Sequence, residues 1–437
     1  MRKAIWITLL IMGLNLINGG LVAQISSKYA FTQSSSVWEP IWGNYATGAM
    51  ADEGLSTPVD IWFTFPYGSY NYTQAKLSSN GWVGLGTALN NPYWNNDLTI
   101  SPILAPLWDD LSTQYGAVQY QTFGNPPYRI FIAQWLAAKW NAYAMNEFNF
   151  MARLHESGQI DFIYGPHIGT PNNPSASIGI SMSPGSTGNY YSILPGTPAT
   201  ASTTTQYQNI QTPLPENLMY IFMPKTAHQV NAAALNLDGP KNPLQNHTAT
   251  YTVTVGNAGN ALLPGGSVTA YLMQGDDILA SAEVPAMSAG GFATATLDWA
   301  PATPGLAYIY AKVVAAGDVD SLNNKTFPYT ITVQEDIGVE EDIISASVSD
   351  VSSYPNPFKQ DVSLQYALNK AAQVSIRVYN LKGQLVRELA NGVKTSGRHT
   401  EVWKGADNGG RSVPNGVYLF VVKTDSQAVS SKVMLMR

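Results

Sequence analysis

Apolar and polar residues alternate with a period of two along much of this chain, and this alternation limits what it can fold into. From Val59 to Phe65 every second residue is apolar, so the apolar side chains fall on one face of an extended strand. The same alternation returns in 250–255, 374–379 and 417–422. Outside the N-terminal segment, no run of residues has a clear helical period. The pattern predicts an all-β protein.

The composition favours short strands joined by turns and excludes several functions. The chain has 437 residues, with 24 Tyr, 37 Gly and 27 Pro, and only 12% of them are charged. At about 100–200 residues per domain, this length predicts two to four domains. The net charge of −6 gives no attraction to nucleic acid, so no nucleic-acid partner is expected. The absence of Cys excludes thiol nucleophiles, zinc–thiolate sites and disulfides.

The first 23 residues have the order of a secretory signal peptide. Arg2 and Lys3 precede an apolar run, Ala4–Ile17, and small residues lead to a cleavage site after Ala23. The alternative is a membrane anchor, but the apolar run is shorter than the roughly 20 residues that span a bilayer. We therefore predict that residues 1–23 are removed and that the exported, mature chain has no transmembrane segment.

Changes in composition divide the rest of the chain. Eight of the eleven Trp residues lie in 29–224, whereas 230–334 is rich in Ala, Thr and Val. Residues 335–350 are acidic and without a clear period, which is typical of a linker, and 351–437 follow as a compact segment. We predict tandem β-sandwiches: one larger N-terminal sandwich, then two immunoglobulin-like sandwiches.

One β-hairpin can be predicted with its register. Treating 156–158 as a three-residue loop, with Gly at the left-handed position, pairs Leu154 with Ile160. The same register places Arg153 opposite Asp161, which is a favourable cross-strand charge pair. A two-residue loop would instead place Leu154 opposite Asp161, and we prefer the first register.

Five spaced motifs follow one another in the last segment: Tyr354–Phe358, Val378–Gln384, Trp403–Gly405, Gly416–Tyr418 and Lys432–Arg437. In this order they resemble the C-terminal sorting domain of proteins exported by the type IX secretion system, and the related immunoglobulin-like domain of the flagellar hook-assembly protein. The resemblance implies the outer-membrane secretion machinery of a Gram-negative cell as a partner. It also implies a secreted protein or one attached to the outer cell surface, with the sorting domain either cleaved or retained. The residues assigned to the export motif are Tyr354, Pro355, Asn356, Pro357, Gly416, Lys432 and Arg437.

The first segment carries four motifs of another family: Phe65–Gly68, Ser79–Trp82, Ala105–Asp110 and Gly158–Gly165. With these motifs the segment resembles the nidogen-like β-sandwich of extracellular proteins. The resemblance implies a matrix or surface module, and no chemistry comes with it.

The middle segment resembles the CARDB group, adhesion-related domains of bacterial surface proteins. Tyr251–Gly259 and Asp318–Asn324 carry this resemblance. The acidic residues of 318–324 could suggest a calcium-binding loop. However, Leu322 and Tyr329 stand where an EF-hand needs oxygen ligands. We expect no metal or cofactor there, and no cofactor elsewhere in the chain.

The sequence contains few residues in patterns that are typical of catalytic sites. The acidic pair Asp109 and Asp110 would have to converge for acid–base chemistry, but neighbouring residues of a strand point to opposite faces. We instead expect a strand end at which these side chains cap the following turn. The five His residues are scattered, and no nucleophile elbow or phosphate-binding loop occurs. We expect no enzyme, with a hydrolase using Asp97, Asp109 and Asp110 as the less favoured alternative, and calcium binding near the pair is left open.

The best candidate for binding is an aromatic and amide-rich loop made of Tyr93, Trp94, Asn95, Asn96 and Asp97. Aromatic faces stack on sugar rings while Asn and Asp side chains bond hydroxyl groups, so the loop suits a glycan. The alternative is that these rings only pack the sandwich. We predict a non-catalytic secreted or cell-surface protein that binds surface glycans or matrix proteins in adhesion. A self-associating structural protein of the cell envelope is the alternative.

Overall fold

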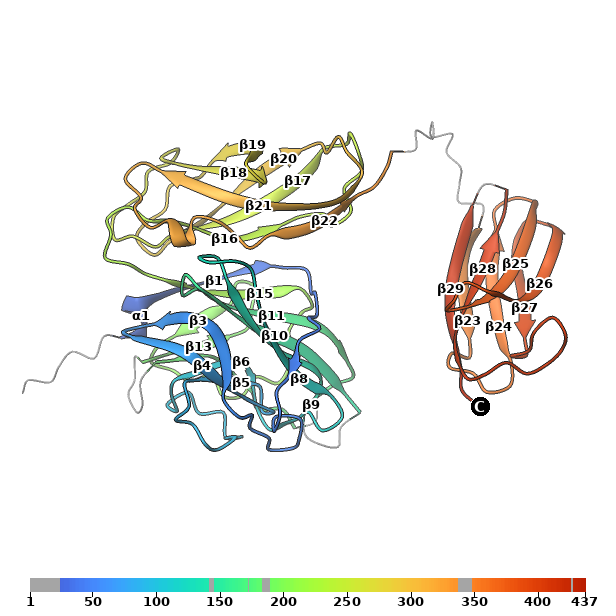
Figure 1. Cartoon of the computed structure of the whole chain (residues 1–437), viewed down its shortest axis with the longest axis horizontal. Helices are drawn as coiled ribbons and strands as arrows, with labels where there is room; N and C mark the ends of the chain where they lie inside the picture. The colour runs from blue at the N-terminus through green and yellow to red at the C-terminus, as the bar shows by residue number, and fades with distance from the viewer. Residues whose placement is uncertain (1–23, 141–144, 172, 183–188, 337–347, 426) are drawn as a thin grey trace, which may run out of the picture. The chain divides into compact units, whose positions relative to one another are not determined.

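The computed structural model describes residues 24–140, 145–171, 173–182, 189–336, 348–425 and 427–437. The signal peptide predicted at 1–23 lies outside these residues, as does most of the linker predicted at 335–350. Apart from the short helix α1 (Ile25–Lys28) and the 3-10 helix η1 (Ser321–Asn323), the described elements are strands (Figure 1). The predicted all-β class is confirmed. The chain forms two compact units, 1–336 and 337–437.

The first sandwich consists of two antiparallel sheets. The order of the eight-stranded sheet is β1 (Tyr29–Ser35), β15 (Leu218–Pro224), β11 (Ile160–Ile168), β10 (Glu147–His155), β9 (Ile130–Trp140), β8 (Ala117–Phe123) and β2 (Asn44–Tyr45), with β7 (Leu111–Ser112) paired to β9. The order of the seven-stranded sheet is β14 (Thr200–Ser202), β13 (Tyr190–Leu194), β12 (Ser177–Ser181), β6 (Ile103–Trp108), β5 (Trp82–Leu85), β4 (Tyr70–Ser78) and β3 (Val59–Tyr67).

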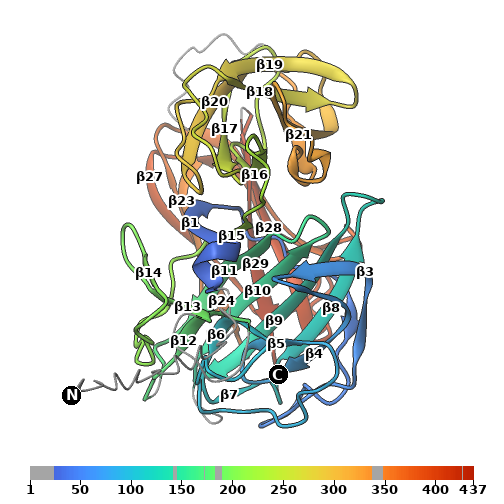
Figure 2. The ribbon, with the colours of Figure 1, turned by 90° about the vertical axis from the view of Figure 1, so that its left-hand side faces the viewer.

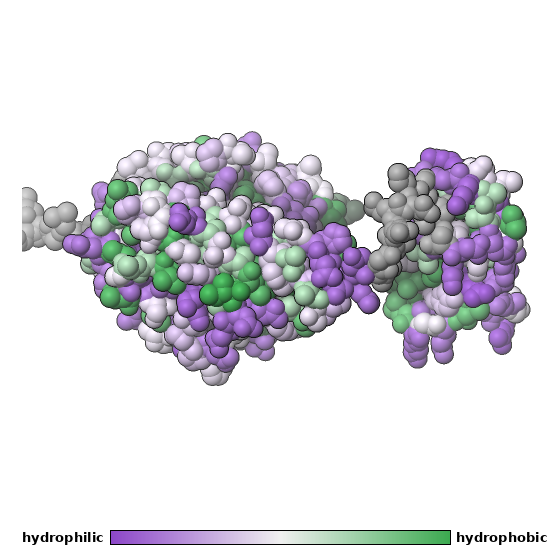
Figure 3. Space-filling view, turned by 90° about the horizontal axis from the view of Figure 1, so that it is seen from above, coloured by the Kyte–Doolittle hydropathy of each residue, from purple (hydrophilic) through white to green (hydrophobic). Residues whose placement is uncertain are grey.

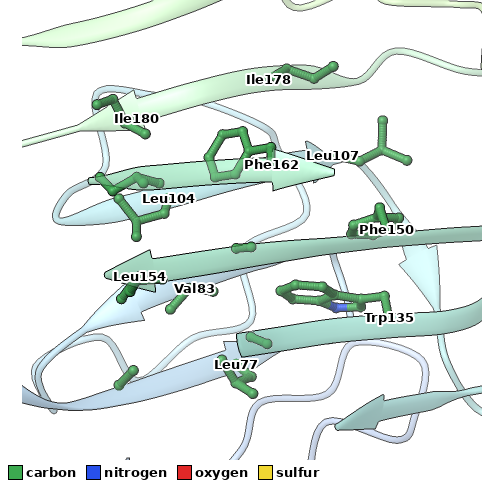
Figure 4. Packing of buried hydrophobic residues seen from close by; sticks show 14 of the residues in the cluster. Leu77, Val83, Leu104, Leu107, Trp135, Phe150, Leu154, Phe162, Ile178 and Ile180 are labelled. Atoms are coloured by element: carbon green, nitrogen blue, oxygen red, sulfur yellow. The ribbon is translucent and has the colours of Figure 1, made fainter. Parts of the chain in front are cut away.

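The core of the first sandwich lies between these two sheets. Figure 4 shows aliphatic and aromatic side chains from both sheets meeting there. Trp135 of β9 stacks on Phe150 of β10 with ring centroids 5.0 Å apart, and its indole N–H donates to the Ser78 carbonyl of β4 (2.8 Å). In β3 buried and exposed residues alternate along the whole strand, which confirms the predicted period of two.

The hairpin of β10 and β11 has the predicted register, with Leu154 opposite Ile160 and Arg153 opposite Asp161. The expected charge pair is present only as an interaction at a distance: the negative charge of Asp161 stabilises the Arg153 cation, but no salt bridge joins the two side chains among the described residues. The Asp161 carboxylate is already bound by two neighbours: His155 Nε2 lies 2.5 Å away, and Gln159 Nε2 donates at 2.8 Å. Opposite residues in a ladder therefore do not guarantee a salt bridge when nearer donors compete.

The second sandwich also has two sheets. Its three-stranded sheet is β16 (Ala232–Asp238), β17 (Ala249–Asn257) and β20 (Phe292–Trp299). Its four-stranded sheet is β19 (Asp277–Glu283), β18 (Val268–Gln274), β21 (Gly305–Ala315) and β22 (Tyr329–Val333). Seen from above, its surface mixes hydrophilic and hydrophobic residues in small patches (Figure 3).

The second sandwich packs against the outer face of the eight-stranded sheet. Figures 1 and 2 show β16 beside β1 and β15. Met223 and Ile163 of the first sandwich belong to one buried cluster with Ala233 and Leu235 of β16. The Gln159 side chain donates to the Leu235 carbonyl (3.0 Å) across this contact. A buried apolar contact with a satisfied buried amide explains why both sandwiches form one compact unit.

The third sandwich is the smallest. Its three-stranded sheet is β23 (Val348–Tyr354), β24 (Val362–Leu368) and β27 (Gly397–Trp403). Its four-stranded sheet is β26 (Leu385–Lys394), β25 (Ala372–Asn380), β28 (Gly416–Lys423) and β29 (Ala428–Leu435). Trp403 is fully buried at its centre, with its ring centroid 4.9 Å from that of Tyr418 and 5.5 Å from that of Phe358. None of the helices within the described residues has the length and apolar character needed to cross a bilayer.

Candidate binding site

The predicted aromatic loop borders a surface pocket of the first sandwich with a volume of about 230 Å³. The pocket lies where the loop meets the end of β6. Its lining consists of Trp94, Asn95, Asn96, Asp109, Asp110, Trp140, Asn173 and Ser175. The fold therefore joins three residues of the predicted loop to the acidic pair at 109–110, which the sequence presented as a separate candidate.

Asp109 is a structural member of this pocket. The chain leaves β6 at Trp108, so the predicted strand end is confirmed. The Asp109 carboxylate is buried and accepts hydrogen bonds from the Trp140 indole (2.7 Å), the Ser175 amide (2.6 Å), the Ser175 hydroxyl (2.9 Å) and the Asp110 amide (2.9 Å). These bonds fix the floor of the pocket, because they hold an aromatic ring and a distant loop against one carboxylate.

Trp94 and Asn95 present free surface to the pocket. The Trp94 side chain is 61% exposed, which is unusual for a large aromatic residue. Asn95, Asp110 and Asn173 are also exposed, and within the described part of the chain their side chains form no hydrogen bond. The pocket thus combines an open indole face with amide and carboxylate groups that are available to a ligand.

Tyr93 and Asn96 act differently from Trp94, although they are its near neighbours. The Tyr93 carbonyl accepts hydrogen bonds from the indole N–H of Trp82 (3.2 Å) and of Trp108 (2.8 Å). The Asn96 side chain donates to the Ser175 carbonyl. Tyr93 and Asn96 both have positive φ angles, 38° and 43°. Their backbone bends and bonds position the loop, which leaves Trp94 pointing into solvent.

Asp97 lies outside the pocket lining and closes the loop. Its carboxylate accepts from the Thr99 amide (2.9 Å) and from the Gln206 side chain (3.1 Å). Partial burial acts to raise the pKa of Asp97, but these hydrogen bonds outweigh it and hold the pKa below its ordinary value. A carboxylate held ionised in this way is suited to fastening a turn.

Asp52 and Glu53 do not line the pocket, but their charges interact with that of Asp110. Partial shielding of its carboxylate from water, together with the negative charges of Asp52 and Asp109, raises the pKa of Asp110 above its ordinary value. Burial also raises the pKa of Glu53, while a hydrogen bond from Asn80 opposes this change. Over the described residues, no three His, Asp or Glu side chains are grouped so as to hold a metal ion.

The remaining lining residues could not be found by reading the sequence. Asn173 and Ser175 follow β11, and Trp140 ends β9, so all three are far along the chain from Trp94. The loop between β11 and β12 brings Asn173 and Ser175 to the pocket only because β12 pairs with β6. No local motif marks residues that meet through sheet pairing.

The residues assigned to the export motif lie around the last strand of the third sandwich. The Asn356 side chain donates to the Lys432 carbonyl (2.9 Å) and accepts from the Met434 amide (2.9 Å). Lys432 thus takes part through its backbone. Tyr354, Pro355 and Pro357 are exposed. Asn356 therefore fastens the segment before β24 along β29.

Arg437 and Gly416 lie close to the end of this strand. Gly416 pairs with Leu435 at the start of β28. The Arg437 guanidinium donates to the Lys404 carbonyl (2.8 Å), and its amide donates to the Asn415 side chain (2.9 Å). Asn356, Lys404, Asn415 and Gly416, which are far apart in the sequence, thus all contact the end of the chain around β29.

Each of the three sandwiches matches one family model. Residues 28–224 match the NIDO-related family, residues 234–326 the CARDB family, and residues 355–428 the FlgD Ig-like domain. The comparison with curated proteins gave no significant match. The resemblances to the NIDO-related, CARDB and FlgD Ig-like families that were inferred from sequence motifs are thereby supported.

Similar solved structures include two of a CARDB domain from Pyrococcus furiosus. The solution NMR structure is 19% identical, covers 24% of this chain and 97% of that domain, and has a TM-score of 0.21. The crystal structure, in complex with di-metal ions, is 19% identical, covers 25% of this chain and 99% of that domain, and has a TM-score of 0.22. Dimeric latent PorU from Porphyromonas gingivalis is 13% identical over 74% of this chain and 29% of PorU, with a TM-score of 0.19. These scores are too low for any functional argument.

Proposed function

We propose that this chain is a non-catalytic secreted or cell-surface protein that binds glycans through the Trp94 pocket. The observation that carries the proposal is an exposed indole beside unpaired amide and carboxylate groups in one concave site. A sugar ring can stack on the indole face while its hydroxyl groups bond to Asn95, Asp110 and Asn173. Binding a glycan in this way requires stacking and hydrogen bonds only, and no catalytic residue.

The state of the carboxylates supports binding rather than catalysis. Asp109 is fully engaged by four donors, and Asp97 is bound to Thr99 and Gln206. A hydrolase of the carboxylate type would use one group as a proton donor and another as base or nucleophile. Asp110 has the raised pKa of a proton donor but is exposed at the rim of the pocket. Asp110 would instead accept hydrogen bonds from sugar hydroxyl groups.

A glycan array probed with the full chain, with and without calcium, tests this proposal. We expect saturable binding to one class of glycan, and we expect Trp94→Ala to weaken it about tenfold, because the stacking surface is lost. Because Trp94 is exposed, the variant should fold normally. An array on which the chain binds nothing, while it self-associates at high concentration, would favour the envelope-structure alternative instead.

We further propose that the third sandwich directs export through the outer-membrane secretion machinery. Its support is the order of the motifs and their assembly around β29, where Asn356 and Arg437 are both hydrogen-bonded. A reporter protein fused to residues 337–437, which include all of β23, should reach the medium or outer surface of a Gram-negative bacterium that has a type IX system. The same fusion in a strain without that system is the control. Retention of the reporter in the periplasm of both strains would contradict the proposal.

A further inference from the structure

A second and larger cavity lies in the compact unit 1–336, between the first two sandwiches, with a volume of about 440 Å³. Its floor is the outer face of the eight-stranded sheet, and β16, Lys241 and the segment 326–330 line it from the second sandwich. Trp42, which also lines it, is 89% exposed, so the cavity is open to solvent on that side. Its size falls within the range of small-molecule sites, about 300–1,000 Å³.

Four of the five charged residues in the cavity lining are already paired. His155 Nε2 lies 2.5 Å from the Asp161 carboxylate. Lys241 Nζ lies 2.8 Å from the Glu39 carboxylate and 3.6 Å from the centroid of the Tyr329 ring. His155 and Lys241 therefore each have a carboxylate partner before any ligand enters.

The fifth charged residue, Arg153, has no direct partner, although the charges of Asp161 and Glu39 act on it from a distance. Its side chain forms no hydrogen bond or ion pair within the described part of the chain, and its Nε atom is buried without an acceptor. Asp161, which the strand register places opposite, is occupied by His155 and Gln159. The Arg153 side chain is partly buried, and a guanidinium stays protonated in proteins. A guanidinium N–H that is buried without an acceptor is costly, and an anion that accepts a hydrogen bond from it would remove this cost.

The rest of the cavity is mostly apolar. Side chains from both sandwiches contribute to it, namely Ile41, Phe123, Ile132, Met219, Leu235 and Phe327. An anion that suits this site must therefore carry an apolar body. A strongly hydrated ion such as phosphate gains nothing from these walls.

We propose that this cavity binds a small carboxylate with an aliphatic or aromatic body, with the carboxylate on Arg153. The planar guanidinium offers a forked pair of donors that matches the two oxygens of a carboxylate. The apolar body fills the space between the two sandwiches. This site is separate from the Trp94 pocket, and its occupant would brace the two sandwiches against each other.

Calorimetric titration of the full chain with octanoate tests the proposal, with octanol as a probe that has the same body and no charge. We expect one octanoate per chain, a rise in Tm of the unit 1–336 with octanoate concentration, and binding of octanol at least tenfold weaker. Arg153→Met should reduce octanoate affinity at least tenfold, and Arg153→Lys should retain part of it. Equal affinity for octanoate and octanol, or octanoate affinity unchanged in Arg153→Met, would overturn the proposal.

A structural readout keeps the proposal testable if Arg153→Met does not fold. Crystals of the wild-type chain soaked in 8-bromooctanoate should give an anomalous bromine peak inside the cavity, with the carboxylate within hydrogen-bond distance of Arg153. A bromine peak elsewhere with an empty cavity would contradict the assignment. Trp94→Ala, which changes only the other pocket, should leave octanoate binding unchanged.

Discussion

Asp109→Ala is expected to lower the free energy of unfolding of the first sandwich by about 3–5 kcal/mol. The Asp109 carboxylate accepts four hydrogen bonds, and its removal leaves the buried Trp140 indole N–H without a partner. It also releases the Ser175 segment from the pocket floor. Urea unfolding of the full chain, followed by tryptophan fluorescence, measures this loss.

Asp110→Ala is the matched control for this prediction. Asp110 is adjacent in sequence, but its side chain is exposed and forms no hydrogen bond with the described residues. Its removal should change the free energy of unfolding by no more than about 0.5 kcal/mol. A loss below about 1 kcal/mol for Asp109→Ala would show that the carboxylate does not organise the pocket floor.

Gly81→Ala is expected to destabilise the first sandwich by about 3–5 kcal/mol, through backbone strain and overpacking together. Gly81 has a φ of +80°, which side-chain-bearing residues rarely adopt. An added Cβ would lie only 1.8 Å from the Leu107 carbonyl oxygen of β6. The backbone of a central strand cannot move away cheaply, so the whole sheet must shift. The same urea unfolding experiment measures the loss.

Gly275→Ala separates the cost of the backbone angle from the cost of the clash. Gly275 also has a positive φ, +58°, but an added Cβ would meet nothing within 4 Å. Gly275→Ala should lower the free energy of unfolding by about 1 kcal/mol, the ordinary penalty of a side chain in this conformation. If Gly81→Ala costs no more than Gly275→Ala, the close approach to Leu107 is absent.

Local sequence patterns were sufficient to predict the strands and one hairpin. The period of two in β3 and the loop ending in Gly158 involve neighbours in sequence, so turn chemistry and alternation determine them. Strand β6 shows no alternation, because all six of its residues are buried. The packed aromatic cluster around Trp82 and Trp108 covers its outer face. Such two-sided burial cannot be read from the strand alone.

The candidate binding site could be predicted only in part. Trp94, Asn95 and Asn96 line the pocket, as expected for a binding loop, but Tyr93 packs on Trp82 and Asp97 binds Thr99 instead. All five residues were predicted to bind a ligand from their residue type alone. What separates them is the direction of each side chain, and this depends on the positive φ angles at Tyr93 and Asn96, which the sequence does not reveal.

Long-range competition explains the unexpected state of Arg153. The hairpin register was predicted correctly, yet the Asp161 carboxylate bonds to His155 and Gln159. Gln159 is held in turn by the Leu235 carbonyl of the second sandwich. Its orientation is thus fixed by a contact between domains. Pairing rules for isolated strands could not include that contact.

The most direct test of the central claim is a calorimetric titration of the best-bound glycan into three proteins: the wild type, Trp94→Ala and Trp42→Ala. Trp42 is even more exposed than Trp94 but lies outside the Trp94 pocket, so it controls for the loss of any surface indole. We predict unchanged affinity for Trp42→Ala and about tenfold weaker binding for Trp94→Ala. Equal affinities in all three proteins would contradict a glycan site at Trp94.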